Sequence, residues 1–309
     1  MNILITGAFG FLGSNIAKLF IARGHSVFGC GRTSLSKADL SSIGFSKWIV
    51  GDIANGILDE VSFLPDVVIH CAGGASVAKS IDNPYEDFQD TVVGASILFE
   101  HIRVNYPHAR VIYPSSAAVY GAYYNVPIPI GAPTNPKSPY GFNKLMAEGI
   151  CNNYFVNYGI KSTIVRLFSV YGSGLRKQIL WDASNRFSSN NNDPFWGSGN
   201  EVRDFVHVDD VSELFYTISI KNDLEGNLII NCGSGIPYSV RQTLEKLALN
   251  FDRHKVVNFN MQIRNGDPLY LCADISKTLD LGWQPKKNIN VGLSDYANWF
   301  KKSIPSSVI

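Results

Sequence analysis

Short apolar runs alternate with amphipathic stretches over the first half of the chain. Runs rich in β-branched residues predict buried strands at residues 3–6, 26–30, 47–50, 66–70, 110–113 and 161–168. Apolar residues recur with helical spacing at residues 14–23 and from Pro84 to about Val104. Strands that alternate with helices pair in parallel through right-handed crossovers. The pattern therefore predicts an α/β fold with a doubly wound parallel sheet.

The first predicted strand ends in a glycine-rich turn. Gly7, Gly10 and Gly13 stand at intervals of three, directly before the first predicted helix. Glycines there let a pyrophosphate approach the helix N-terminus, where free N–H groups favour anions. A tight strand-to-helix turn without a ligand is the plainer alternative. The position between strand and helix is the context that a dinucleotide site requires, so we expect a Rossmann-type fold.

The pattern of elements changes beyond Tyr171. Polar turns at residues 190–194 and 197–199 separate shorter pieces: strands at 202–208, 228–231 and 256–259, and helices at 209–218 and 239–250. We therefore expect a dinucleotide-binding domain at residues 1–170, with sheet elements returning around 201–232. Residues 171–309 would form mainly a smaller C-terminal α/β substrate-binding domain.

Composition excludes several classes of protein. The chain has 309 residues, a net charge of +1, 45% hydrophobic and 17% charged residues, which argues against disorder and against nucleic-acid or membrane partners. No signal peptide is expected, because the N-terminus enters a strand at once. Five scattered cysteines suit a reducing cytoplasm and show no metal-ligand spacing; they are Cys30, Cys71, Cys151, Cys232 and Cys272.

The end of the second strand bears on the choice of cofactor. In dinucleotide folds an acid at this point accepts a hydrogen bond from the ribose 2′-hydroxyl and favours NAD. Here the sequence reads Gly31-Arg32-Thr33, without an acid. Arg32 could pair with a 2′-phosphate instead, which favours NADP while leaving NAD possible. An exposed loop arginine without a ligand is the alternative.

Tyr140 and Lys144 form a candidate proton-transfer pair. They open a helix after a proline-rich loop that we expect to border the active site, and their spacing puts both side chains on one helix face. A nearby ammonium would lower the pKa of the phenol, and an upstream serine could hydrogen-bond the same substrate oxygen. A nicotinamide would then carry the hydride. The spacing alone also occurs by chance.

Nine segments carry a resemblance to a known family. They are TGAFGFLG (6–13), GDI (51–53), HCAG (70–73), SSAAVYG (115–121), SPYGFNK (138–144), RLFSVYG (166–172), RDFVHVDD (203–210), RNGD (264–267) and LGWQP (281–285). In this order the chain resembles the extended short-chain dehydrogenase/reductases, specifically the NAD(P)-dependent nucleotide-sugar epimerase/dehydratase family. The resemblance implies a nucleotide-sugar substrate and a homodimer formed through the helices at 84–104 and 140–158.

The resemblance also implies residue roles. Ser116, Tyr140 and Lys144 would be catalytic, with Tyr140 as acid and base. Cofactor contacts would come from Gly7, Gly10, Phe11, Gly13, Arg32, Asp52, Ile53, Cys71, Ala72, Tyr140 and Lys144. Substrate contacts would come from Ser115, Ser116, Ser169, Arg203, Arg264 and Asp267, with the two arginines near the diphosphate. No metal site is expected.

Four positions depart from the family pattern. The acid after the second strand is missing. Ala117 and Ala118 follow Ser116 where 4,6-dehydratases carry Asp-Glu, which argues against a dehydratase. Thr91 and Ser169 stand where many relatives have asparagine. The last two departures weaken the transfer of any particular substrate from the family.

Three functions follow as hypotheses. The favoured one is an NADP(H)-preferring reductase of a nucleotide-linked 4-keto-6-deoxyhexose, acting at C4. The alternative is a nucleotide-sugar 4-epimerase, which removes the hydride and returns it to the other face of the sugar. A non-catalytic dinucleotide-binding regulator is a third. Net consumption of NADPH separates reductase from epimerase, and absence of any turnover would favour the regulator.

Overall fold

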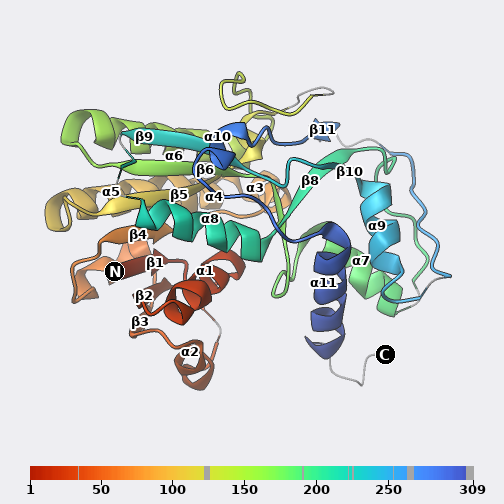
Figure 1. Ribbon diagram of the computed structural model, residues 1–309, viewed down its shortest axis with the longest axis horizontal. Coiled ribbons are helices and arrows are strands. Elements are labelled where there is room, and N and C mark those ends of the chain that lie inside the picture. The colour runs from red at the N-terminus through yellow and green to blue at the C-terminus, as the bar shows by residue number, and fades with distance from the viewer. Residues whose placement is uncertain are drawn as a thin grey trace.

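A parallel seven-stranded sheet forms the centre of the molecule (Figure 1). The computed structural model describes residues 1–33, 35–121, 126–189, 191–221, 223–224, 226–252, 254–262 and 268–303. The strands run in the order β3-β2-β1-β4-β5-β6-β9. Their bounds are β1 Asn2–Thr6, β2 Ser26–Gly31, β3 Lys47–Val50, β4 Val67–His70, β5 Arg110–Ser116, β6 Ser162–Leu167 and β9 Asn227–Cys232. The predicted doubly wound sheet is confirmed, and its order reverses between β1 and β4.

Alternating side chains of the strands build a core on each face of the sheet. Ile3 and Ile5 of β1 pack with α1 (Phe11–Ala22) and α8 (Val208–Ile220). Leu4, between them, packs on the opposite face with α5 (Gly94–Asn105) and α6 (Pro139–Tyr158). This is the period of two that a strand buried on both faces requires. The two helical layers leave the carboxyl ends of the strands for a ligand.

The long helix expected from Pro84 is continuous but not regular. It runs as α4 (Pro84–Phe88), a π-helical segment η3 (Gln89–Val93) and α5. Single π turns inside helices often occur at functional sites. Here the π segment carries Asp90 and Thr91, and the Thr91 hydroxyl accepts a hydrogen bond of 2.9 Å from the Gly74 backbone N–H. The segment therefore holds the loop that follows β4.

A second, smaller sheet lies beside the carboxyl edge of the first. Its centre is β8 (Val202–His207), which pairs with β7 (Ser169–Tyr171), β10 (Pro237–Ser239) and β11 (Tyr270–Leu271). We expected sheet elements to return to the main sheet around 201–232, and only β9 does so. The strand β8 is held outside, because β7 turns away after Phe168 and pairs with it. No strand forms at 256–259 among the described residues there, where Phe259 makes only an isolated bridge to Phe195.

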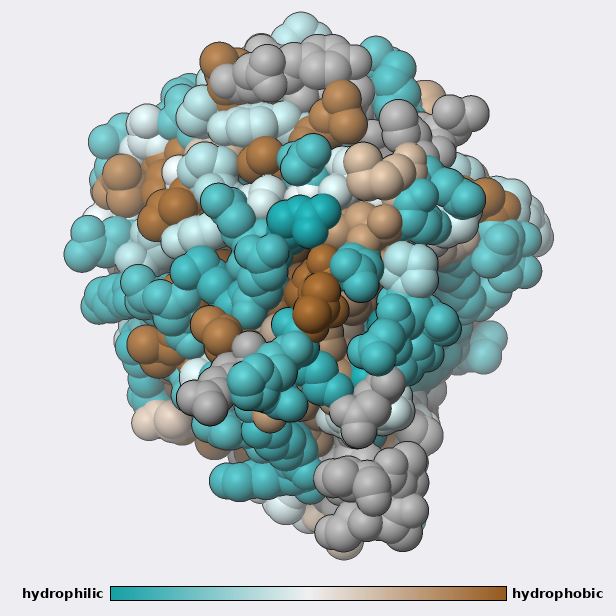
Figure 2. Space-filling view, turned by 90° about the vertical axis from the view of Figure 1, so that its right-hand side faces the viewer, coloured by the Kyte–Doolittle hydropathy of each residue, from teal (hydrophilic) through white to brown (hydrophobic). Residues whose placement is uncertain are grey.

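Three helices pack around the smaller sheet. They are α7 (Gln178–Ser188), α9 (Val240–Ala248) and α11 (Ile289–Ser303), and their apolar faces share one core with Phe205 of β8. The face that includes α9 is covered mainly by hydrophilic side chains (Figure 2). Shorter helical turns complete the chain: α2 Lys37–Ile43, η1 Ile53–Asn55, η2 Ile57–Glu60, α3 Val77–Asp82, η4 Ala117–Val119 and α10 Ser276–Leu279. Among the described residues, no helix has the length and apolarity needed to cross a bilayer.

Candidate active site

A large cleft runs along the carboxyl ends of the central strands. Its volume is about 1240 Å³, and it continues from the turn after β1 to β8 and α7. Pockets for one small ligand hold roughly 300–1,000 Å³, so there is room for a dinucleotide with a second ligand beside it. Every residue predicted to contact the cofactor lines this cleft: Gly7, Gly10, Phe11, Gly13, Arg32, Asp52, Ile53, Cys71, Ala72, Tyr140 and Lys144.

The glycine turn is shaped by close backbone packing. Gly7 has a φ of 65°, and a Cβ on it would lie 2.5 Å from the Ala72 backbone nitrogen. A Cβ on Gly13 would collide with the Gly7 carbonyl oxygen. Gly10 is the N-cap of α1 and supplies no side-chain hydrogen bond, so the first N–H groups of the helix stay available. A pyrophosphate fits such a cradle, as expected for a dinucleotide.

Two carboxylates surround Arg32 at the far end of the cleft. Its guanidinium donates a hydrogen bond of 2.7 Å to Asp90 and lies 3.5 Å from Asp52. No acid follows β2, but two carboxylates from other segments lie at this position: Asp52, which follows β3, and Asp90 of the π segment. Sequence reasoning missed Asp90, because nothing in the periodicity of a long helix shows which polar residue faces a loop 58 positions earlier.

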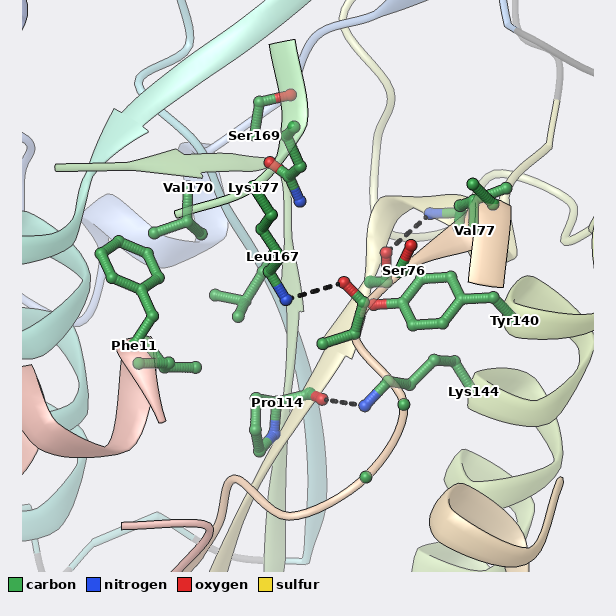
Figure 3. A pocket seen from close by; sticks show the side chains of 18 of the residues that line it. Phe11, Ser76, Val77, Pro114, Tyr140, Lys144, Leu167, Ser169, Val170 and Lys177 are labelled. Carbon is green, nitrogen blue, oxygen red and sulfur yellow. Dashed lines mark hydrogen bonds between the residues drawn. The ribbon is translucent and has the colours of Figure 1, made fainter. Parts of the chain in front are cut away.

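Tyr140 and Lys144 lie together on one wall of the cleft (Figure 3), where Ser116 also lines it. Ser116 ends β5, and Tyr140 is in the first turn of α6. Burial raises the pKa of Tyr140, and a hydrogen bond with Ser116 partly offsets that effect. The Ser116 hydroxyl also accepts from the Ala118 N–H at 3.1 Å. The serine and the phenol therefore face the same point of the cleft.

The Lys144 ammonium lies beneath the phenol. It donates 3.1 Å to the Pro114 carbonyl and lies 5.9 Å from the centre of the Tyr140 ring and 5.1 Å from that of Tyr113. Burial lowers its pKa to about 8. The expected lowering of the Tyr140 pKa by this ammonium is absent in this arrangement, where burial of the phenol dominates.

Ser115 does not present its hydroxyl to the cleft. Its side chain is 2% exposed and donates 2.5 Å to Glu148, which forms an ion pair of 2.7 Å with Arg166. Successive side chains of a strand point to opposite faces, so Ser115 and Ser116 cannot both face a ligand. The Ser115 hydroxyl is thus directed to Glu148, although the residue lines the cleft, and its expected contact with the substrate stays a prediction.

Of the four other residues expected to contact the substrate, the structure describes two. Ser169 and Arg203 line the cleft on the side of the smaller sheet, and Arg203 donates 2.7 Å to the Pro268 carbonyl. Arg264 and Asp267 lie outside the described residues. The proline-rich loop borders the cleft through Gly121, Lys137 and Ser138, as expected. No cluster of metal-ligating side chains occurs in the part of the chain that the structure describes.

Lys177 is a cleft residue that sequence reasoning missed. It immediately precedes α7, and its Nζ donates 3.0 Å to the Ala75 carbonyl on the loop after β4. Burial lowers the pKa of this lysine. The signal that could have drawn attention to it is the helical spacing of Leu180, Ala183 and Phe187, which marks a helix starting just after Lys177.

Comparison with known proteins decides the family. The model of the NAD dependent epimerase/dehydratase family matches residues 3–233. The chain belongs to this family. It is 29% identical to a UDP-glucose 4-epimerase from Corynebacterium glutamicum, over 93% of this chain and 91% of that protein. It is also 29% identical to a CDP-paratose 2-epimerase from Salmonella typhi, over 97% of this chain and 99% of the relative.

Solved structures agree with the family. A UDP-glucose 4-epimerase from Thermotoga maritima, solved with UDP-glucose, superposes with a TM-score of 0.88 at 28% identity, covering 98% of this chain and 99% of that one. A UDP-glucuronic acid 4-epimerase from Bacillus cereus, solved with UDP-glucuronic acid and NAD, gives 0.85 at 25% identity, with coverage of 98% and 99%. The expected family, fold and enzyme class are confirmed. The chain is an NAD-dependent enzyme of the epimerase/dehydratase type, and these relatives favour epimerisation over the reductase hypothesis.

Proposed function

We propose that this protein is an NAD-dependent 4-epimerase of a nucleotide-linked hexose. The observation that carries the proposal is the meeting of Ser116, Tyr140 and Lys144 on the wall of a cleft whose floor is the glycine turn. The epimerases that the chain resembles along nearly their whole length support the same reaction. Ala117 and Ala118, after the serine, lack the carboxylates that elimination of water needs.

The side chains suit reversible proton transfer at the C4 oxygen. Bound NAD would supply a hydride acceptor that later returns the hydride. Tyr140 would take the proton of the C4 hydroxyl and later give it back, while Ser116 would donate a hydrogen bond to the same oxygen. Lys144 would stabilise the phenolate electrostatically from one helical turn away. The sugar must present its other face before the second transfer, so the cleft has to hold the nucleotide while freeing the hexose ring.

The surroundings of Arg32 favour NAD over the NADP that we expected. A 2′-phosphate placed beside Arg32 would also meet the carboxylates of Asp52 and Asp90. Like charges disfavour that arrangement, whereas carboxylates accept hydrogen bonds from ribose hydroxyls. The relatives solved with NAD support the same choice.

Contacts to the nucleotide-sugar would come from the side of the smaller sheet. Arg203 would contact the diphosphate with its guanidinium, and Ser169, which also lines the cleft, would contact the same ligand. Arg264 and Asp267 would add to this site by family resemblance. The nucleotide and the sugar are open to test, since the named relatives act on UDP- and CDP-linked sugars.

A homodimer and a cytoplasmic location are part of the proposal. Phe142 and Met146 of α6 expose 52% and 43% of their surface, on the helix through which we expect two copies to pack. Exposed apolar side chains would be better accommodated by a partner than by water. The five cysteines are all free, which suits a reducing compartment.

The test is a turnover assay with two arms. In the first arm the protein, with NAD, receives UDP-glucose, and chromatography follows interconversion with UDP-galactose while nicotinamide absorbance stays constant. In the second arm it receives NADPH and a nucleotide-linked 4-keto-6-deoxyhexose. Interconversion without net cofactor change supports the epimerase. Stoichiometric loss of NADPH absorbance with no epimerisation of any hexose nucleotide would contradict it and support the reductase.

A further inference from the structure

Lys177 spans the cleft. Its side chain extends from the segment between β7 and α7 toward Ser76 and Tyr140 (Figure 3). Its Nζ reaches the Ala75 carbonyl, 3.0 Å away, on the loop that follows β4. The two segments belong to different parts of the fold: one leads to the smaller sheet, the other leaves the central sheet. The ammonium therefore lies across the space between the candidate catalytic side chains and the substrate side of the cleft.

The charge of Lys177 is poorly compensated. No carboxylate lies within 4.0 Å of its Nζ among the residues that the structure describes, and the Ala75 carbonyl accepts its one described hydrogen bond. Two other cations of the cleft have carboxylate partners: Arg32 pairs with Asp90, and Arg186 pairs with Asp182 at 2.9 Å. An ammonium has three donors, and a half-buried one gains most from an acceptor that carries charge.

We propose that Lys177 binds an anionic oxygen of the nucleotide-sugar, exchanging its contact with Ala75 for that oxygen. The inference rests on the proposed function and extends it to a specific ligand for the substrate. Two chemical sources of the oxygen fit a lysine at this place: the diphosphate, and the C6 carboxylate of a uronic acid. Either would form a charge-assisted hydrogen bond, and either would remove the burial penalty that now depresses the pKa of the lysine.

The experiment measures binding directly rather than turnover. Wild type, Lys177→Met, Lys177→Arg and the control Lys161→Met are titrated by calorimetry with UDP, UDP-glucose, UDP-glucuronic acid and, separately, NAD. Lys161 is exposed at the start of β6, at the opposite edge of the sheet, so the control makes the same change of charge away from the cleft. We expect Lys177→Met to weaken nucleotide-sugar binding at least tenfold, and Lys177→Arg to restore most of it.

The ligands distinguish the two sources. Equal loss for UDP, UDP-glucose and UDP-glucuronic acid assigns the contact to the diphosphate. Loss confined to UDP-glucuronic acid assigns it to the carboxylate, and in both cases the difference from wild type should shrink at high salt, with NAD affinity unchanged. Wild-type affinity of Lys177→Met for every sugar nucleotide, or an equal loss of NAD affinity, overturns the inference and leaves the epimerase proposal standing. Failure of the wild type to bind any of the three overturns both.

Discussion

The side-chain amide of Asn143 donates a hydrogen bond of 2.7 Å to the carboxylate of Asp87. Both residues are buried, and Asn143 directly precedes Lys144 on the catalytic helix. The Asp87 side chain also packs closely against Gly74, where a Cβ would collide with it. The bond therefore joins the catalytic helix to α4 and to the loop after β4.

Asn143→Ala should destabilise the protein, because it leaves a buried carboxylate without this donor. The expected loss in free energy of unfolding is about 1–3 kcal/mol, measured by denaturant titration. Asn157→Ala, on the exposed part of the same helix, is the matched control and should stay within about 0.5 kcal/mol of wild type. Equal stabilities for the two variants would show that the Asp87 contact contributes nothing.

Tyr140→Phe should reduce turnover by roughly a thousandfold or more and leave NAD affinity nearly intact, since it removes only the proton donor. Ser116→Ala should lose less, on the order of a hundredfold, because one polarising hydrogen bond is gone. Tyr113→Phe is the control: its hydroxyl is buried and has no hydrogen-bond partner among the described residues, so its removal should keep activity. Near-normal kcat in Tyr140→Phe would refute the assignment.

Asp90→Asn should change cofactor preference. Removing this carboxylate frees Arg32 for a 2′-phosphate, so NADP affinity should rise roughly tenfold, while NAD changes by less than about threefold. The gain should vanish in the double variant with Arg32→Ala. Fluorescence titration of both cofactors measures the effect, with Asp59→Asn as the control for net charge. Tighter binding of NADP than of NAD by the wild type would contradict the proposed cofactor.

The pKa of Lys144 predicts a stability difference that depends on pH. Burial holds this pKa at about 8 in the folded protein, whereas an unfolded chain has a value of about 10.4. Between these values the unfolded chain keeps a proton that the folded one has released, so the free energy of unfolding rises with pH. Below pH 8 both states are protonated and the contribution is constant.

Lys144→Met removes that contribution. We compare the free energy of unfolding of the two proteins without nucleotide. The value for wild type minus the value for the variant should increase by about 1–2 kcal/mol from pH 7 to pH 9.5. Denaturant titrations at several pH values measure it, and the groups shared by both proteins cancel. Parallel pH profiles would mean that the lysine has an ordinary pKa in the folded state.

Phe142→Glu and Met146→Glu should prevent dimer formation. A carboxylate in a packed apolar interface lacks a partner there, whereas on an exposed helix face it meets water. Light scattering should give twice the chain mass for wild type and the single chain mass for either variant, at unchanged thermal stability of the subunit fold. Wild-type protein that remains a monomer at high concentration would remove the homodimer from the proposal.

Periodicity and glycine spacing predicted the central sheet and its first turn, because there the local sequence pattern also determines the role in the folded structure. The turn at Gly7 is such a case, because the same residues permit the backbone turn and the ligand approach. The helix α7 escaped prediction, although its buried residues have helical spacing. The position of β8 could not be predicted either, since its partner β7 is only three residues long and its pairing is non-local.

The site residues show the same difference between local motifs and non-local contacts. Ser116, Tyr140 and Lys144 lie in motifs with fixed spacing, so their meeting could be anticipated. The contacts of Arg32 with Asp90, Asn143 with Asp87 and Lys177 with Ala75 join residues 56 to 102 positions apart, with no motif to link them. Ser115 lies in a recognised motif, but the motif did not show that its hydroxyl donates to Glu148.

Glu148 connects three elements, since it accepts from Ser115 of β5, pairs with Arg166 of β6 and lies on α6 two turns beyond Tyr140. The proposed catalytic serine and tyrosine are thus held by the central framework rather than by the segments that would face the sugar. Mutations in those segments can accumulate without disturbing the hydride and proton chemistry. If the proposed reaction at C4 holds, this separation gives an evolutionary route by which one framework acquires new sugar specificities while its chemistry is preserved.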